Sequence, residues 1–255
     1  MHQILTMCGR YIITSPPEAL RQLLEYLEQP NFPPRHNVAP TQPVPVVRLW
    51  EGRRQFALVR WGFIPAWVKD PRAFSLVINA RSDTVLEKPA FRNAIRRRRC
   101  LVPADGFYEW KVEGGRRQPY AVLPRRRGPI AFAGIWEAWM GPNGEEIESA
   151  AIVTTEASAA LRPLHARMPV VVPPQSFATW LDCLNVDAAE AARLMVPAPD
   201  DFFEAYPVSD AVNRVANDTP DLLTPLAGLP PAEPAPPPAS RARAKLDDGA
   251  QGSLF

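Results

Sequence analysis

The chain has 255 residues, of which 46% are hydrophobic and 22% charged, and its net charge is +2. These values are typical of one sizeable globular domain, and so small a net charge does not by itself argue for a nucleic-acid partner. The three cysteines lack CxxC spacing, which argues against a disulfide framework and favours a location in the cytoplasm. No stretch of the sequence is apolar for long enough to span a membrane. We expect no cofactor, and no metal site either, because the cysteines and histidines show no recognised ligand spacing.

The first predicted element is a helix at 15–26. Ser15 is a plausible N-cap residue, and the proline that follows suits the first turn. Its leucines recur three and four residues apart, so they form one apolar stripe that packs on the core. These leucines are Leu20, Leu23, Leu24 and Leu27.

A proline-rich loop at 30–45 separates this helix from a series of strand-like runs. Two glycine-containing segments, 114–115 and 141–144, predict hairpin turns between strands. The 31 prolines also favour short strands and turns over a helical bundle. The predicted strands are 44–50, 55–61, 74–78, 100–102, 106–112, 120–123, 130–136, 150–155 and 170–172.

Two short helices are predicted towards the end of the chain, at 176–183 and at 187–195. The second begins with Asp187 in the cap position of a capping box. Many strands, few helices and no regular βαβ alternation predict an α+β fold with an antiparallel, barrel-like β core and a few flanking helices. From Leu229 the chain is rich in Pro and Ala, so 229–255 is predicted to be a disordered tail.

Cys8 follows Met7 in the string MCGRY. If translation starts at Met7, removal of that methionine exposes Cys8, and residues 1–7 are then absent from the mature protein. The freed α-amine has a pKa of roughly 7.7–8.0, so it can attack an aldehyde to form an imine, which the thiol then traps as a thiazolidine ring. Considered without the rest of the sequence, Cys8 is better explained as an ordinary buried thiol.

Four further sequence motifs favour the functional interpretation of Cys8 over the structural one. They are Asn79-Ala80-Arg81 after an apolar run, Glu109 in a strand flanked by aromatic residues, His165 in the string Leu-His-Ala-Arg-Met-Pro, and the Asn-Val-Ala-Pro string that ends at Pro40. Each alone has an ordinary structural explanation. Together with the MCGRY start, their order and spacing closely resemble the SRAP family, the SOS-response-associated peptidase-like proteins, from Met7 to about residue 226.

The resemblance implies an enzyme of the DNA damage and SOS response that senses abasic sites in single-stranded DNA and forms a thiazolidine crosslink with them. The implied domain spans 8–228. Cys8 matches the nucleophile, Asn79 a residue that holds the sugar or the cysteine, Glu109 an acid/base group near the α-amine, and His165 a residue that assists sugar-ring opening and adduct reversal. The implied DNA contacts are Arg10, Pro40, Trp67, Arg81 and Arg167.

A run of arginines gives a local basic stripe in this chain of small net charge. Such a stripe can bind phosphates, but a solvated charge run explains each single arginine equally well. The sequence leaves both interpretations open. The residues are Arg92, Arg96, Arg97, Arg98 and Arg99.

Three other functions remain open from the residues. A cysteine hydrolase or autopeptidase would use Cys8 as nucleophile and His165 as base, with Asn79 or Glu109 orienting the base, and its activity would survive acylation of the α-amine. An abasic-site lyase acting through the Cys8 amine would cut the DNA. A non-catalytic single-strand binder would not depend on Cys8.

The C-terminal string resembles the short peptide by which bacterial repair proteins bind the replication sliding clamp. In that peptide a Gln and a Leu-Phe pair are the anchors, and here they correspond to Gln251, Leu254 and Phe255. Gly252 departs from the usual apolar residue, and short matches also arise by chance. We otherwise expect a monomer.

Overall fold

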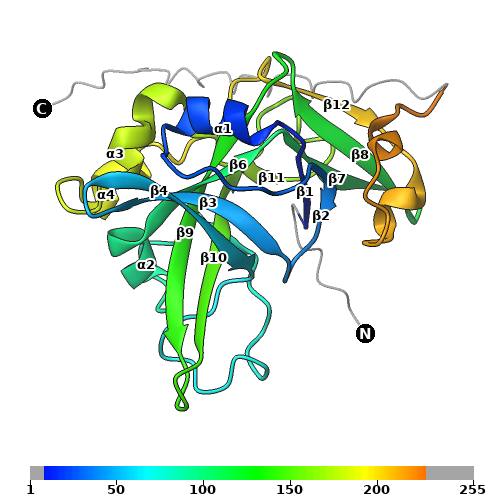
Figure 1. Ribbon diagram of the computed structural model, residues 1–255. Helices are drawn as coiled ribbons and strands as arrows, with labels where there is room; N and C mark the ends of the chain where they lie inside the picture. The colour runs from blue at the N-terminus through cyan, green and yellow to red at the C-terminus, as the bar shows by residue number, and fades with distance from the viewer. Residues whose placement is uncertain (1–8, 228–255) are drawn as a thin grey trace, which may run out of the picture.

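The computed structural model describes residues 9–227, and its core is a closed five-stranded β-barrel (Figure 1). The barrel strands are β3 (Pro43–Trp50), β4 (Arg53–Trp61), β6 (Arg99–Ala104), β9 (Ile130–Met140) and β10 (Glu146–Glu156). Pairing runs from β10 through β4, β3, β6 and β9 and back to β10, which closes the ring. Only the β4–β10 pair is parallel.

A second, fully antiparallel sheet lies beside the barrel. Its members are β1 (Arg10–Ile13), β2 (Arg35–Val38), β7 (Gly106–Glu113), β8 (Arg116–Pro124) and β12 (Phe203–Pro207). They are arranged in the order β12-β8-β7-β1-β2. The two sheets share a large apolar core, in which Phe107 of the second sheet contacts Phe132 of the barrel edge to face.

Two very short strands extend the barrel at the end of β10. Strand β5 (Asn79–Arg81) runs parallel to β10, and β11 (Arg167–Pro169) runs antiparallel to it. In this register Arg81 lies opposite Thr154, while Arg167 lies opposite Glu156. The end of β10 therefore carries polar residues from two distant parts of the sequence.

Short helices cover the barrel from outside. Helix α2 packs against β9, and α3 packs against β6. Figure 1 shows α3 and α4 next to each other at one end of the barrel. The helices are α1 (Pro17–Leu24), α2 (Arg92–Arg97), α3 (Phe177–Leu181) and α4 (Ala188–Ala192), with 3-10 turns η1 (Pro174–Ser176), η2 (Asp210–Asn213) and η3 (Pro220–Leu223).

The predicted fold class, an antiparallel barrel-like β core with a few flanking helices, is confirmed. Asp187 is confirmed as the N-cap of α4, because its carboxylate accepts a hydrogen bond from the Glu190 backbone N–H at 2.8 Å. The Gly114-Gly115 turn joins β7 to β8, and both glycines have positive φ values, 56° and 78°, as that hairpin requires.

The first helix is shorter than predicted. Ser15 is not its N-cap, because the Ser15 hydroxyl and backbone N–H both bind the Asp105 carboxylate, and Pro16 occupies the cap position. The helix stops at Leu24, where Glu25 adopts a left-handed conformation with φ 55°. Leu27 therefore lies beyond the helix and is 72% exposed instead of packing on the core.

Two predicted strands were wrong. Residues 74–78 form an extended loop, in which the carbonyls of Val77 and Ile78 accept hydrogen bonds from Phe63 and Ile152. Residues 170–172 contribute one isolated bridge at Val171, because the paired segment β11 ends just before them. Strands β1, β2, β5 and β12 and helix α2 were not predicted.

Several predictions concern residues that the structure does not describe. These are the absence of residues 1–7, the disordered tail 229–255, and the clamp-binding anchors Gln251, Leu254 and Phe255, all of which stay predictions. Between residues 9 and 227, no helix is both long enough and apolar enough to cross a membrane.

Candidate functional site

Two predicted DNA-contact residues, Arg81 and Arg167, meet at one carboxylate. The Arg81 guanidinium donates from Nε and from a terminal nitrogen to Asp83, at 3.1 and 2.6 Å. A terminal nitrogen of Arg167 lies 3.6 Å from the same carboxylate. The hydrogen bond from Arg81 holds the pKa of Asp83 below its usual value. Two cations and one anion leave this Arg81–Asp83–Arg167 cluster with net positive charge.

The two arginines of the cluster differ in how firmly their side chains are held and in how much of each is exposed. Arg167 is held against β10, because its guanidinium donates to the hydroxyl and the carbonyl oxygen of Thr154, at 3.3 and 2.5 Å. Its side chain is only 13% exposed, and burial lowers its pKa. The Arg81 side chain is 56% exposed, so its outer edge is open to solvent. A guanidinium edge of this kind can bind a phosphate through charge-assisted hydrogen bonds that lie in one plane.

His165 lies in the loop that leads into β11, and its ring orientation is fixed by the chain itself. The Arg167 backbone N–H donates to His165 Nδ1 at 3.1 Å. Because Nδ1 is the acceptor, a neutral imidazole carries its proton on Nε2. The His165 residue as a whole is half-buried.

Asn79 is the first residue of β5 and is half-buried. The residue before it, Ile78, has a carbonyl that accepts a hydrogen bond from the Trp61 indole N–H at 3.1 Å. The Trp61 ring in turn meets the Tyr11 ring edge to face, with 5.3 Å between centroids. These two contacts fix β5 relative to the beginning of β1.

Glu109 lies on β7 in the second sheet, where it is only 5% exposed. In the β1–β7 register Arg10 is opposite Tyr108, so Gly9, one residue earlier, is level with Glu109. The described chain therefore begins at the level of Glu109 on the neighbouring strand, where the Glu109 carboxylate accepts a hydrogen bond from the Trp110 backbone N–H at 3.1 Å. Cys8, the predicted nucleophile, lies just outside the described residues.

The other three predicted DNA-contact residues lie in different settings. The Arg10 guanidinium binds the Asn37 side chain and the carbonyls of residues 212 and 213, and burial lowers its pKa. Pro40 is half-buried in the turn after β2. Trp67 is 60% exposed, and its ring contacts the ring of Phe74 edge to face. Their roles in DNA binding stay predictions.

The predicted basic stripe is not one continuous surface. Arg99 is buried and donates to four backbone carbonyls, and Arg98 pairs with the buried carboxylate of Glu137 at 3.1 Å. The change occurs because helix α2 ends at Arg97 and the barrel strand β6 begins at Arg99. Arg92, Arg96 and Arg97 remain exposed on α2.

The two cysteines that the structure describes have structural positions. Cys100 lies in the barrel core, where burial raises the pKa of its thiol, and Cys183 accepts a hydrogen bond from the Arg99 backbone at 3.5 Å. Over residues 9–227 no group of three or more His, Cys, Asp and Glu side chains is arranged to hold a metal ion.

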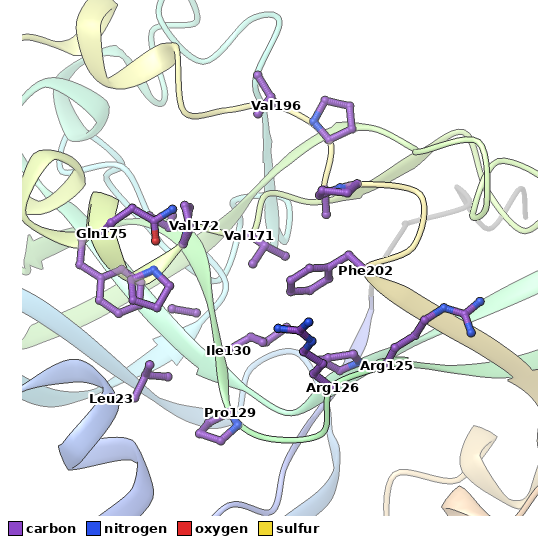
Figure 2. Close-up of a pocket in the computed structure, with 18 of the residues that line it drawn as sticks. Leu23, Arg125, Arg126, Pro129, Ile130, Val171, Val172, Gln175, Val196 and Phe202 are labelled. Atoms are coloured by element: carbon purple, nitrogen blue, oxygen red, sulfur yellow. The ribbon is translucent and has the colours of Figure 1, made fainter.

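A large apolar groove of about 770 Å³ lies between α1, the β8–β9 loop and the segments 171–175 and 196–202. Figure 2 shows Phe202 and Val171 facing each other across it, with Arg126 beside Phe202 and Arg125 directed away. None of the predicted site residues lines this groove. The groove and the polar residues around β10 are therefore separate features.

Sequence reasoning missed three residues that organise the site, namely Asp83, Thr154 and Trp61. One signal for Asp83 was available, because an acidic residue two positions after Arg81 can reach back to it. No such local signal exists for Thr154 and Trp61, which act through partners distant in the sequence.

Comparisons with known proteins identify the family and similar folds. A family model described as SOS response associated peptidase (SRAP) matches residues 7–215. Abasic site processing protein YoqW of Bacillus subtilis is 34% identical, over 85% of this chain and 99% of that protein. Abasic site processing protein HMCES of Gallus gallus is 33% identical, over 81% of this chain and 70% of that protein. A crystal structure of a Bacteroides thetaiotaomicron protein superimposes with a TM-score of 0.76 at 26% identity, covering 86% of this chain and 100% of that chain.

Proposed function

The chain belongs to the SRAP family, and we propose that it processes abasic sites in single-stranded DNA by forming a covalent thiazolidine crosslink through Cys8. The observation that carries this proposal is the register of β1 and β7, which places Gly9 level with Glu109, a residue whose side chain is buried. Cys8 is one residue further, and consecutive Cα atoms are about 3.8 Å apart. A carboxyl group next to the N-terminal amine is the arrangement that imine chemistry needs.

The proposed reaction requires a mature chain that begins at Cys8. Its neutral α-amine attacks the aldehyde carbon of the open abasic sugar and gives a carbinolamine. Glu109 delivers the proton with which the carbinolamine hydroxyl leaves as water and then takes up the proton from the nitrogen, so that an imine remains. The Cys8 thiol then adds to the imine carbon, its proton passes to the nitrogen, and the thiazolidine ring closes. The net change is loss of one water from protein plus DNA.

His165 is proposed to open the sugar ring. An abasic deoxyribose is mostly a closed hemiacetal, and a proton donor at the ring oxygen speeds its opening. In a neutral His165 the Nε2–H group can donate a hydrogen bond to that oxygen, because Nδ1 accepts from the Arg167 backbone; the proton that the ring oxygen gains comes from the anomeric hydroxyl. A hydrolase would need the opposite tautomer, since its histidine must accept the thiol proton at the exposed nitrogen. The geometry therefore favours crosslinking over the peptidase alternative.

The remaining residues bind the DNA in this proposal. Arg81 and Arg167 contact a phosphate next to the lesion, supported by the net positive charge of their cluster. Trp67 stacks on a neighbouring base through its exposed ring, a contact that tolerates any sequence. Asn79, two residues before Arg81 on β5, holds the sugar or Cys8. The relatives named abasic site processing proteins support this assignment.

The test is an intact-mass measurement. Protein beginning at Cys8 is mixed with a single-stranded oligonucleotide that contains one abasic site. We expect a product at the mass of protein plus DNA minus one water. The matched control is the same protein with Met7 retained, in which Cys8 has an amide in place of the amine and should give no product.

Two further variants identify the chemistry. Cys8→Ser keeps the amine and loses the thiol, so it should give only an imine that borohydride can trap. Glu109→Gln should slow adduct formation and leave DNA affinity unchanged. If protein beginning at Cys8 leaves the oligonucleotide intact and unmodified, the crosslinking function is wrong. Cut DNA without an adduct would identify a lyase instead.

A further inference from the structure

The Arg81–Asp83–Arg167 cluster poses a physical problem. Two guanidinium groups approach one another, and their like charges repel, an effect that contributes to the lowered pKa of Arg167. Arg167 is fixed by Thr154, but Arg81 is half-exposed and sits at the end of a strand of only three residues. Without a compensating anion, Arg81 would turn away from Arg167 into solvent.

Asp83 supplies that anion, and its contacts are specific. It binds Arg81 through two hydrogen bonds along one edge of the guanidinium and faces Arg167 at 3.6 Å. A guanidinium has five N–H groups in one plane, so the edge that Asp83 does not use remains free for a second anion. Both arginines are thereby turned towards one place with their planes restrained.

We propose that Asp83 is a positioning residue, which holds Arg81 beside Arg167 so that the two share one DNA phosphate. This inference deepens the proposed function, because it assumes that the cluster binds DNA. It assigns Asp83 to binding and not to the chemical step, since Asp83 acts through Arg81.

The opposite role for Asp83 is that of a competitor, a carboxylate that occupies Arg81 until a phosphate displaces it. The geometry favours positioning, because Asp83 uses only one edge of Arg81 and partly neutralises two cations at once. Repulsion between Asp83 and the phosphate is offset by the two positive charges between them. The two roles predict opposite effects on affinity.

The experiment measures the affinity of single-stranded DNA carrying a tetrahydrofuran analogue of the abasic site, which has no aldehyde. We expect Asp83→Ala to raise the Kd between threefold and thirtyfold and Asp83→Glu to recover part of the loss. The rate of crosslinking at saturating abasic DNA should stay within twofold of wild type. Because the analogue cannot react, failure of the crosslinking chemistry would leave this measurement intact.

A matched control and a double mutant complete the test. Glu18 binds Arg21 on α1 through two hydrogen bonds of 2.9 Å, so Glu18→Ala removes a comparable exposed pair and the same charge. It should leave the Kd unchanged. If Asp83 acts through Arg81, adding Asp83→Ala to Arg81→Ala should cause no further loss of DNA affinity. Tighter binding by Asp83→Ala, an unchanged Kd, or a loss that persists in the Arg81→Ala background would each overturn the proposal.

Discussion

Replacement of Arg99 by methionine tests whether this arginine holds the fold together. Arg99 is 1% exposed, and its guanidinium binds the ends of two helices. It donates to Ile95 in α2 at 3.0 Å and to the carbonyl of Trp180 in α3 at 2.5 Å. Two more bonds reach the loop that follows α3, at Asp182 and Val186. One side chain thus binds four carbonyl groups, of which that of Asp182 also accepts a hydrogen bond from the Val186 backbone N–H at 3.2 Å.

The hydrogen bonds of Arg99 indicate how much the substitution lowers the free energy of unfolding. Methionine fills similar apolar space but donates no hydrogen bond, and a buried carbonyl left without a donor costs about 1–3 kcal/mol. The four losses do not add fully, because the variant no longer has to desolvate a guanidinium. A hydrogen bond to a charged group contributes about 1.5–3 kcal/mol, so we expect the partly offset loss of the four bonds to total about 3–5 kcal/mol. For a domain of this size, 1 kcal/mol lowers Tm by about 2–4 °C, so we expect a fall of roughly 6–20 °C.

Urea and thermal unfolding measure this loss, with Arg97→Met as the matched control. Arg97 is exposed two residues earlier, so its substitution should change the free energy of unfolding by less than about 0.5 kcal/mol. A loss below about 1 kcal/mol for Arg99→Met would refute the reasoning. So would a stable Arg99→Met protein that loses affinity for DNA, because Arg99 would then contact the nucleic acid.

Two further predictions concern Trp67 and Glu137. Trp67→Ala should weaken single-stranded DNA binding by about 1–3 kcal/mol in fluorescence anisotropy while Tm barely changes, because the ring is exposed; an unchanged Kd would exclude stacking. Burial raises the pKa of Glu137 more than Arg98 lowers it. The stability that this shift contributes is complete below the unfolded pKa of about 4.3 and is lost as pH rises through the higher folded pKa. Glu137→Gln should therefore be the more stable protein at neutral pH, with a difference that shrinks towards pH 4, and a difference independent of pH would contradict this.

The barrel could be predicted because its strands are strongly apolar. In β3, for example, Val44, Val46 and Val47 are buried, and such a run of β-branched residues favours a strand whatever surrounds it. The predicted strands 44–50 and 55–61 lie within β3 and β4 with errors of one or two residues at their ends. Local propensity and burial agree in these strands, so no distant information was needed.

The second sheet was harder to predict from the sequence, because β1, β2 and β12 are four or five residues long and partly polar. They form strands because partners distant in the sequence supply their hydrogen bonds. The short strand β5 is likewise defined by β10, against which Asn79 pairs with Ile152. A sequence window cannot contain such a partner, so these elements could not be predicted from local pattern.

The arginines show that local sequence is also insufficient to predict which side chains are exposed. Arg97 and Arg99 are chemically identical neighbours in one basic run, yet one is exposed and the other fills the space between α2 and α3. Their difference arises from the turn between helix and strand at residue 98, which changes the direction of successive side chains. Composition therefore indicated positive charge correctly, but it could not indicate which charges face the solvent.

The site also depends on how the two sheets are docked, and this places a structural requirement on the proposed chemistry. Glu109 belongs to the second sheet, whereas Asn79 and Arg81 belong to a strand beside the barrel. The Trp61 side chain joins the two parts, with its ring on Tyr11 of β1 and its indole N–H on the carbonyl before Asn79. Proton transfer falls off steeply with distance, so a small shift between the sheets would separate Glu109 from a sugar held at β5. In the proposed mechanism, the packing of large aromatic side chains at this junction therefore supports the catalytic residues without taking part in a chemical step.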